Sequence, residues 1–263
     1  MPRQCADRCH AMQRSAPTLA SAAWLLAASI AFWALLAWMA FDMGHPLVQL
    51  TMPGGPDWHA DNIAAIFAMW AVMMAAMMLP SALPMILTFV RLNVQQGEPG
   101  RARLFVVAYL LVWSAFSGAA TALQWALQRA DWVDPMIVST SPALSASLLL
   151  IAGAYQFSPL KRVCLSHCRT PVGFLLGEWR PGRAGAFAMG LRHGGLCTGC
   201  CWALMALLFV GGVMNIAWIA ALSVAVAIEK MAPRGERVAA VLGMLLLAGG
   251  AWKLVAMLGG AAA

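Results

Sequence analysis

One short stretch of the chain, from His193 to Trp202, combines an imidazole with three thiols. The thiols belong to Cys197, Cys200 and Cys201, and the stretch lies inside an apolar segment long enough to form a membrane-spanning helix. At about 100° of rotation per residue, His193, Cys197 and Cys200 share one face of such a helix, and Cys201 lies only slightly off it. The spacing therefore predicts that these four side chains share one ligand.

A second pair of thiols, Cys164 and Cys168, precedes this segment with three residues between them. Lysine and arginine residues flank the pair, and nearby positive charge favours the thiolate form, which binds metal ions or attacks disulfides. We therefore assign both cysteines to the same metal site. A similar spacing, Cys5 to Cys9, occurs in the N-terminal tail, where chain termini are commonly disordered, and no site is predicted there.

Thioethers form a further group of soft donors. Five methionines lie within ten residues, at positions Met69, Met73, Met74, Met77 and Met78. Met73 and Met77 follow one helical face, and we assign these two to the metal, although methionine also serves as an ordinary packing residue. Thioether, thiolate and imidazole together are the donor set expected for Cu(I). Pro80 and Pro84 follow, and they predict a kink that frees backbone carbonyl groups near these side chains.

The composition places the chain among integral membrane proteins. Hydrophobic residues make up 62% of the 263 residues and charged residues 10%, whereas soluble domains carry about 25% charged residues. The net charge of +7 comes from basic residues dispersed in short loops, with no aromatic-rich basic patch. Nucleic acid is therefore excluded as a partner, and the lipid bilayer is expected as the surrounding medium.

Hydropathy predicts an all-α fold, a polytopic transmembrane helix bundle with about seven spanning helices. The apolar segments are Leu19 to Phe41, Ile63 to Val90, Leu104 to Leu127, Ile137 to Phe157, Ala186 to Val210, Val213 to Ile228 and Val238 to Leu258. Residues 1–18 are predicted to be a disordered cytoplasmic tail. Residues 19–263 form one transmembrane domain, with a cytoplasmic cysteine-containing loop at 158–187.

Lysine and arginine accumulate before the first segment and between the second and third, the fourth and fifth, and the sixth and seventh. This one-sided distribution predicts a cytoplasmic N-terminus and a C-terminus outside. All seven cysteines then lie on the cytoplasmic side or inside the membrane. A reducing cytoplasm disfavours structural disulfides, so metal binding, redox chemistry or simple burial remain for the thiols.

Two further features concern helix geometry. Gly194 and Gly195 weaken the helix beside His193, and they predict a break there of the kind found in transporter binding sites. Glu229 and Lys230 end the sixth segment, where long charged side chains commonly reach the membrane surface. The alternative is that they form a gate or a partner for Arg192.

Several motifs occur along the chain in a fixed order. They are Met73–Pro80, Tyr155–Lys161, Cys164 and Cys168 with Pro171, Met189–Gly194, Cys197–Trp202, Gly212–Asn215 and Glu229–Lys230. In this combination the chain resembles a family of predicted metal-binding integral membrane proteins of unknown function, over most of its length. The resemblance implies a polytopic inner-membrane protein with a metal site at the cysteine and histidine positions, and it implies no reaction.

These observations predict a membrane protein that handles a soft metal, with copper favoured, by transport, insertion or chaperoning. Zinc and an iron–sulfur cluster also accept thiolates. The alternative is a thiol–disulfide or electron-transfer protein that uses the same cysteines, because C-x-x-C is also a redox spacing. No P-loop or catalytic residue is evident, so an enzyme is disfavoured. A metalloprotein or metallochaperone partner is expected, in a bacterial plasma membrane.

Overall fold

The computed structural model describes residues 2–55, 57–95, 98 and 100–260, and it describes no side chain for residues 2–17, 95 and 260. The described chain folds into α-helices joined by short connections. These helices are α1 (Pro2–Phe41), α2 (Pro46–Gln49), α3 (Ala60–Gln95), α4 (Arg101–Arg129), α5 (Pro142–Tyr155), α6 (Pro159–Arg169), α7 (Pro171–Glu178), α8 (Gly182–Ala206), α9 (Leu208–Gly211), α10 (Ile216–Met231) and α11 (Gly235–Gly260). Outside them, a single isolated β-bridge joins Val133 and Ser139 in the described connections.

Five helices are long and apolar enough to cross a membrane, and α5 with α6 forms a sixth candidate that is bent by 65°. The five lie within α1, α3, α4, α8 with α9, and α11. Helix α10 has 16 residues, so it is shorter than a full span. The all-α, polytopic prediction is confirmed, and about seven spans agrees roughly with these helices.

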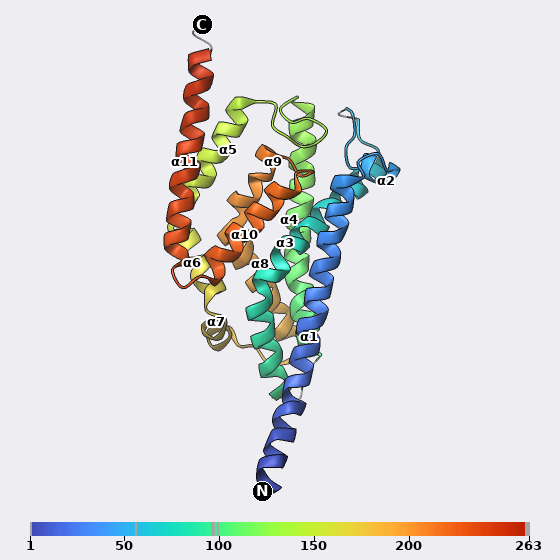
Figure 1. Ribbon diagram of the computed structural model, residues 1–263, viewed down its shortest axis with the longest axis vertical. Helices are drawn as coiled ribbons and strands as arrows, with labels where there is room; N and C mark the ends of the chain where they lie inside the picture. The colour runs from blue at the N-terminus through green and yellow to red at the C-terminus, as the bar shows by residue number, and fades with distance from the viewer. Residues whose placement is uncertain (1, 56, 96–97, 99, 261–263) are drawn as a thin grey trace.

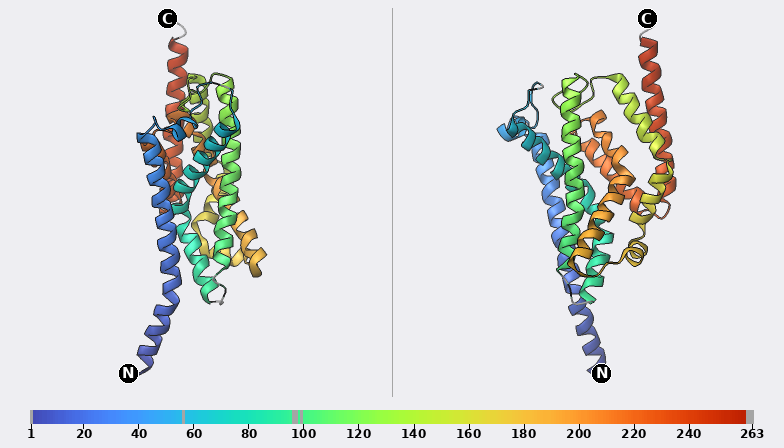
Figure 2. Two further views of the ribbon diagram at one scale, coloured as in Figure 1. Left: turned by 90° about the vertical axis from the view of Figure 1, so that its right-hand side faces the viewer. Right: turned by 180° about the vertical axis from the view of Figure 1, so that it is seen from behind.

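The helices pack around α8, which contacts α4, α5, α6, α9 and α10. Helix α4 runs along α8, α5 runs along α11, and α1 runs along α3. The two chain ends lie at opposite ends of the molecule, as Figure 1 shows and the turned views in Figure 2 confirm. The elements that carry the sequence-predicted donors, α3, α6 and α8, therefore belong to one connected bundle.

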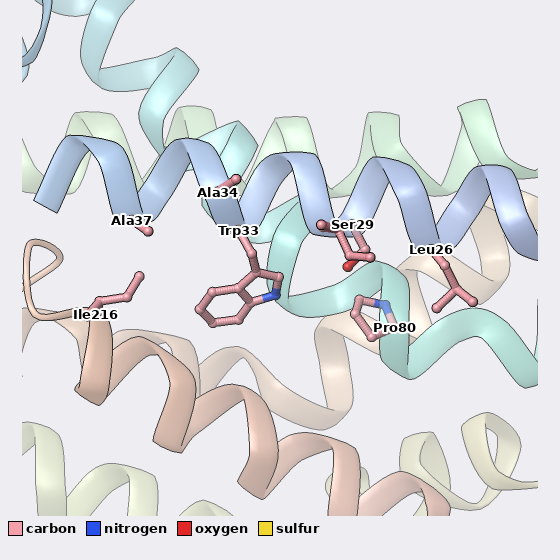
Figure 3. Close-up of a pocket in the computed structure, with 8 residues that line it drawn as sticks. Leu26, Ser29, Trp33, Ala34, Ala37, Pro80 and Ile216 are labelled. Atoms are coloured by element: carbon pink, nitrogen blue, oxygen red, sulfur yellow. The ribbon is translucent and has the colours of Figure 1, made fainter. Parts of the chain in front are cut away.

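Helix α3 stays helical through Pro80 and Pro84 and changes direction along its length (Figure 1). Pro80 has no backbone N–H, so the Ala76 carbonyl loses its partner one turn earlier. The indole Nε1 of Trp33 in α1 donates to that carbonyl oxygen at 3.0 Å. Trp33 and Pro80 line the same groove of about 560 Å³ between α1, α3 and α10 (Figure 3). The predicted bend and freed carbonyl are thus confirmed, and α1 supplies the missing donor.

Helix α8 is continuous past Gly194 and Gly195, so the predicted break beside His193 is wrong. The glycines instead allow α8 to lie close to α4. A Cβ at Gly190 would meet the Ala108 Cβ at 2.8 Å and the backbone of Phe105, and one at Gly194 would meet the Val112 side chain at 2.9 Å. This is the small-residue packing by which membrane helices approach closely.

This packing predicts opposite effects for two glycines of one helix. Gly190→Ala should lower the free energy of unfolding by about 1–3 kcal/mol, because a methyl group there pushes α8 away from α4. Gly195→Ala is the matched control, since no atom lies within 4 Å of its added Cβ, and alanine should raise helix stability by about 1 kcal/mol. The thermal unfolding midpoints of the two purified variants in detergent provide the test. Equal midpoints for both variants would contradict the close α4–α8 packing.

Candidate metal centre

Three thiols of the candidate site come from consecutive turns of α8. Cys197, Cys200 and Cys201 are each 1% exposed. The Sγ atoms of Cys200 and Cys201 lie 3.0 and 3.1 Å from the backbone oxygen of Cys197 and donate to it. Helical spacing of three and four residues makes this arrangement possible, and it places the three side chains on one side of α8.

Helix α6 brings the other two described thiols to this cluster. Ser158 caps its first turn by accepting from the Lys161 backbone N–H at 3.0 Å, and a proline follows at the first helical position. Cys168, near the other end, interacts directly with the side chains of Cys197 and Cys200. The Cys164 sulfur packs against α8 at Gly199, where a Cβ would lie 2.9 Å from it. The structure thus brings together all five cysteines that the sequence assigns to the site.

These five cysteines are free thiols, with no disulfide among them. Cys168 is the partly exposed member of the group, and the other four are buried. We call the five side chains the thiol cluster. They are Cys164, Cys168, Cys197, Cys200 and Cys201.

Cys197 differs from its neighbours because a lysine ammonium donates to its sulfur. The Lys230 ammonium, from α10, lies 3.0 Å from Cys197 Sγ and donates to it. The Tyr109 hydroxyl, from α4, lies 3.2 Å from the same sulfur and 3.3 Å from the Met78 carbonyl oxygen. Cys200 and Cys201 act as donors, whereas Cys197 accepts, so Cys197 is the sulfur whose surroundings suit a thiolate.

Helix α3 closes the cluster on a further side. Met78 Sδ lies 3.9 Å from Cys201 Sγ and 3.9 Å from Lys230 Nζ. Met73 and Met77 are buried in the same helix, at 0% and 1% exposure, and among the described side chains neither makes a hydrogen-bond-range contact with a cysteine. The α3 thioether at the thiol cluster is therefore that of Met78, on the neighbouring stripe of the helix.

His193 lies one turn from Cys197 in a cage of aromatic rings. Its ring centroid is 5.8 Å from that of Phe105, 5.6 Å from that of Tyr109 and 5.5 Å from that of Phe174. The side chain is 2% exposed, and its Nδ1 has no hydrogen-bond partner within the described part of the chain. The imidazole shares the predicted face of α8, but rings rather than thiols surround it.

The charged residues at the end of α10 are buried, so their predicted place at the membrane surface is wrong. Glu229 Oε2 pairs with Lys161 Nζ of α6 at 2.6 Å, and both side chains are at most 2% exposed. Arg192, the alternative partner, pairs with Glu178 at 2.8 Å instead. Glu229 and Lys230 therefore point into the bundle, toward α6 and the thiol cluster respectively.

Across the described residues, no three or more histidine, cysteine, aspartate or glutamate side chains are arranged to hold a metal ion. The thiols of Cys200 and Cys201 donate to the backbone carbonyl of Cys197 in this arrangement. The donors are sulfur atoms in a buried site, which fits a soft monovalent ion better than Mg²⁺ or Ca²⁺.

The chain matches a protein family whose description names a metal. Residues 67–253 match the family model described as "PpoB2: Copper chaperone". The chain belongs to this copper chaperone family. No curated protein and no solved structure matches the chain.

The copper chaperone match covers α3 from Phe67 onward and continues into α11, so it includes every candidate ligand named above. It makes the resemblance to metal-binding membrane proteins more specific, since the family description names copper. Cys5 and Cys9 fall before the matched residues, and their side chains lie outside the described residues.

Sequence reasoning missed three residues that the fold places against the thiols. Tyr109 and Lys230 contact Cys197, and Met78 contacts Cys201. Two signals were present: Tyr109 is one of only two tyrosines, and Lys230 is a cation at the end of an apolar segment. Neither signal names the thiol partner, because the contacts join helices that are far apart in the sequence.

Proposed function

We propose that this protein is a membrane copper chaperone that binds Cu(I) at the thiol cluster and transfers it to or from a metalloprotein or a soluble metallochaperone. One observation carries the proposal: α6 and α8 bring five free thiols together inside the bundle, beside the Met78 thioether. Thiolate and thioether donors select Cu(I). Cys197 and Cys200 are the proposed principal ligands, with Cys168, Cys201 and Cys164 around them, and His193, one turn from Cys197 among aromatic rings, is a further candidate donor.

The position of Cys168 supports transfer of the ion. Cys168 is partly exposed, whereas Cys197 and Cys200, which it contacts, are buried. An ion can therefore pass from the edge of α6 to α8 by exchanging one sulfur ligand at a time. Such exchange needs no ATP-binding domain.

We place the protein in a bacterial plasma membrane, with the N-terminus in the cytoplasm and the C-terminus outside. The one-sided distribution of basic residues supports this orientation, and so do the chain ends at opposite ends of the molecule (Figure 1). Cys168 then lies on the cytoplasmic half of the bundle, where a reduced thiol persists.

The methionines test this function against the thiol–disulfide alternative. Met78→Leu conserves volume and apolar character, so a dithiol protein should tolerate it, whereas a copper site should lose affinity by about tenfold. The measurement is Cu(I) affinity by chelator competition, on the full chain purified anaerobically in detergent. Met73→Leu/Met77→Leu, measured in parallel, tests the two thioethers that the sequence assigns to the metal.

A wild-type protein that binds no copper and forms a reversible disulfide between Cys168 and Cys197 or Cys200 would overturn the copper function. Thiol titration before and after mild oxidation detects that disulfide. The contact between Cys168 and the two α8 cysteines is the observation that makes this alternative concrete.

A further inference from the structure

Lys230 places a positive charge inside the thiol cluster. Its Nζ donates to Cys197 Sγ at 3.0 Å and to Ser81 Oγ at 3.2 Å, and it lies 3.9 Å from Met78 Sδ. These contacts come from α8 and α3, and Lys230 itself is 6% exposed. The ammonium therefore belongs to the inner wall of the site and does not reach the surface.

Within the described residues, no carboxylate lies within ion-pair distance of Lys230 Nζ. Glu229, the neighbour of Lys230 in the sequence, forms its ion pair with Lys161, whose Nζ lies 2.6 Å from Glu229 Oε2. The other two described ion pairs, Arg101 with Glu98 and Arg192 with Glu178, involve no residue of α10. An isolated charge in an apolar interior is very unfavourable, so it requires an anion nearby. Cys197 is the thiol within hydrogen-bond distance that can supply one.

The other buried lysine of this region, Lys161, has a different kind of partner. Both lysines are buried and both belong to the same region of the bundle, where α6 and α10 meet. Lys161 faces a carboxylate, which is the usual solution for a buried cation, whereas Lys230 faces sulfur. A carboxylate partner would be sufficient for a lysine that only stabilises the fold. A sulfur partner couples the lysine charge to whatever the thiols bind.

We propose that Lys230 is a specificity-determining residue that makes the site selective for a monovalent over a divalent metal ion, an inference that rests on the proposed copper function. A monovalent ion held by two thiolates carries one net negative charge, which the ammonium neutralises. A divalent ion held by the same two thiolates is already neutral, and the ammonium then leaves one uncompensated positive charge. Because uncompensated charge is costly at membrane depth, Lys230 favours the first complex and disfavours the second.

Removal of the Lys230 charge should reverse this preference. In Lys230→Met the monovalent complex keeps an unbalanced negative charge, and the divalent complex becomes neutral. The ratio of Cu(I) affinity to Zn(II) affinity should therefore fall by about tenfold or more, with each single affinity moving in the opposite direction. Lys230→Arg retains the charge and should retain the ratio.

The test uses the full chain, purified anaerobically in detergent. Cu(I) affinity is measured by competition with bicinchoninate and Zn(II) affinity by competition with a chromophoric zinc chelator. Lys230→Gln, which keeps hydrogen-bonding atoms near Ser81, repeats the test if the methionine variant does not fold. Lys253→Met is the matched control, because Lys253 is exposed on α11, and its affinity ratio should equal that of the wild type.

An unchanged ratio in folded Lys230→Met or Lys230→Gln that still binds copper would overturn the role of Lys230 and leave the copper function standing. Loss of both metals from a folded, neutral variant would also overturn it, since the charge argument requires Zn(II) binding to persist. Failure of the wild type to bind copper would instead overturn the proposed function, and the selectivity inference with it.

Discussion

Lys161→Met should lower the free energy of unfolding by about 3–5 kcal/mol, because it leaves a buried carboxylate without its partner. Lys161 Nζ lies 2.6 Å from Glu229 Oε2, and the two side chains are 1% and 2% exposed. The Glu229 Oε1 atom has no hydrogen-bond partner in the described structure, so no other hydrogen bond holds this carboxylate once the ammonium is lost. Thermal unfolding of the variant in detergent, followed by circular dichroism, provides the measurement.

The double variant Lys161→Met/Glu229→Met separates a lost partner from lost packing. Replacing both members of a buried ion pair with apolar side chains of similar volume is often neutral or stabilising. The double variant should therefore unfold at a temperature close to that of the wild type, well above Lys161→Met. Arg192→Met is the exposed control, since Arg192 is 54% exposed in its pair with Glu178, and it should change stability by about 0–1 kcal/mol. A double variant as unstable as the single one would contradict this account.

The ion pair matters for the site because it joins α6 to α10. Helix α6 carries Cys164 and Cys168, and α10 carries Lys230 next to Glu229. Arg169 adds a second connection, since its guanidinium donates to the backbone oxygens of Ala232 and Pro233 at 2.7 Å each. We therefore expect stability and the proposed copper binding to be coupled at this point, because the same contacts hold the α6 thiols and the lysine against α8.

The helices and their apolar faces could be predicted because hydropathy and a period of 3.6 residues act locally. The segment 158–187 lies between the apolar segments, and hydropathy left its local structure open. We predicted a cytoplasmic loop there, and the structure folds it into α6, α7 and the start of α8. The signal for a helix was present, since Ser158 before Pro159 is a typical helix start.

The sequence also did not show which methionines of α3 reach the thiol cluster. Met73, Met74, Met77 and Met78 are all at most 1% exposed. All four are buried, so an apolar pattern in the sequence cannot tell which of these methionines faces α8. Tertiary packing settles it, and the Met78 Sδ lies 3.9 Å from Cys201 Sγ.

Lys230 shows a further limit of the sequence, which concerns charge. A lysine at the end of an apolar helix ordinarily reaches the membrane surface with its long side chain. That expectation fails here because other groups inside the bundle compensate for its charge. Cys197 precedes Lys230 by 33 residues, and the two meet because α10 packs against α8. Pairings of this kind depend on tertiary structure, which a single sequence does not contain.

Cys197→Ser/Cys200→Ser should reduce the copper content from roughly one ion per chain to background, because a hydroxyl is not a soft donor. Serine is close to cysteine in size, and its hydroxyl can keep the hydrogen bond that Cys200 donates to the Cys197 carbonyl. The variant should therefore fold, and the loss should reflect ligand chemistry rather than collapse of the bundle. Mass spectrometry of the metal content after anaerobic purification gives the result.

Cys5→Ser/Cys9→Ser is the matched control for this loss, since it also removes two thiols but in the segment that precedes the residues of the copper chaperone match. It should retain the full copper content. Copper kept by the α8 variant and lost by the tail variant would transfer the site to the N-terminus. If both variants kept their copper, the α8 thiols would be packing residues and not copper ligands. The α8 thiols carry the prediction because they are the ones that meet a second helix, a thioether and a cation in the same buried place.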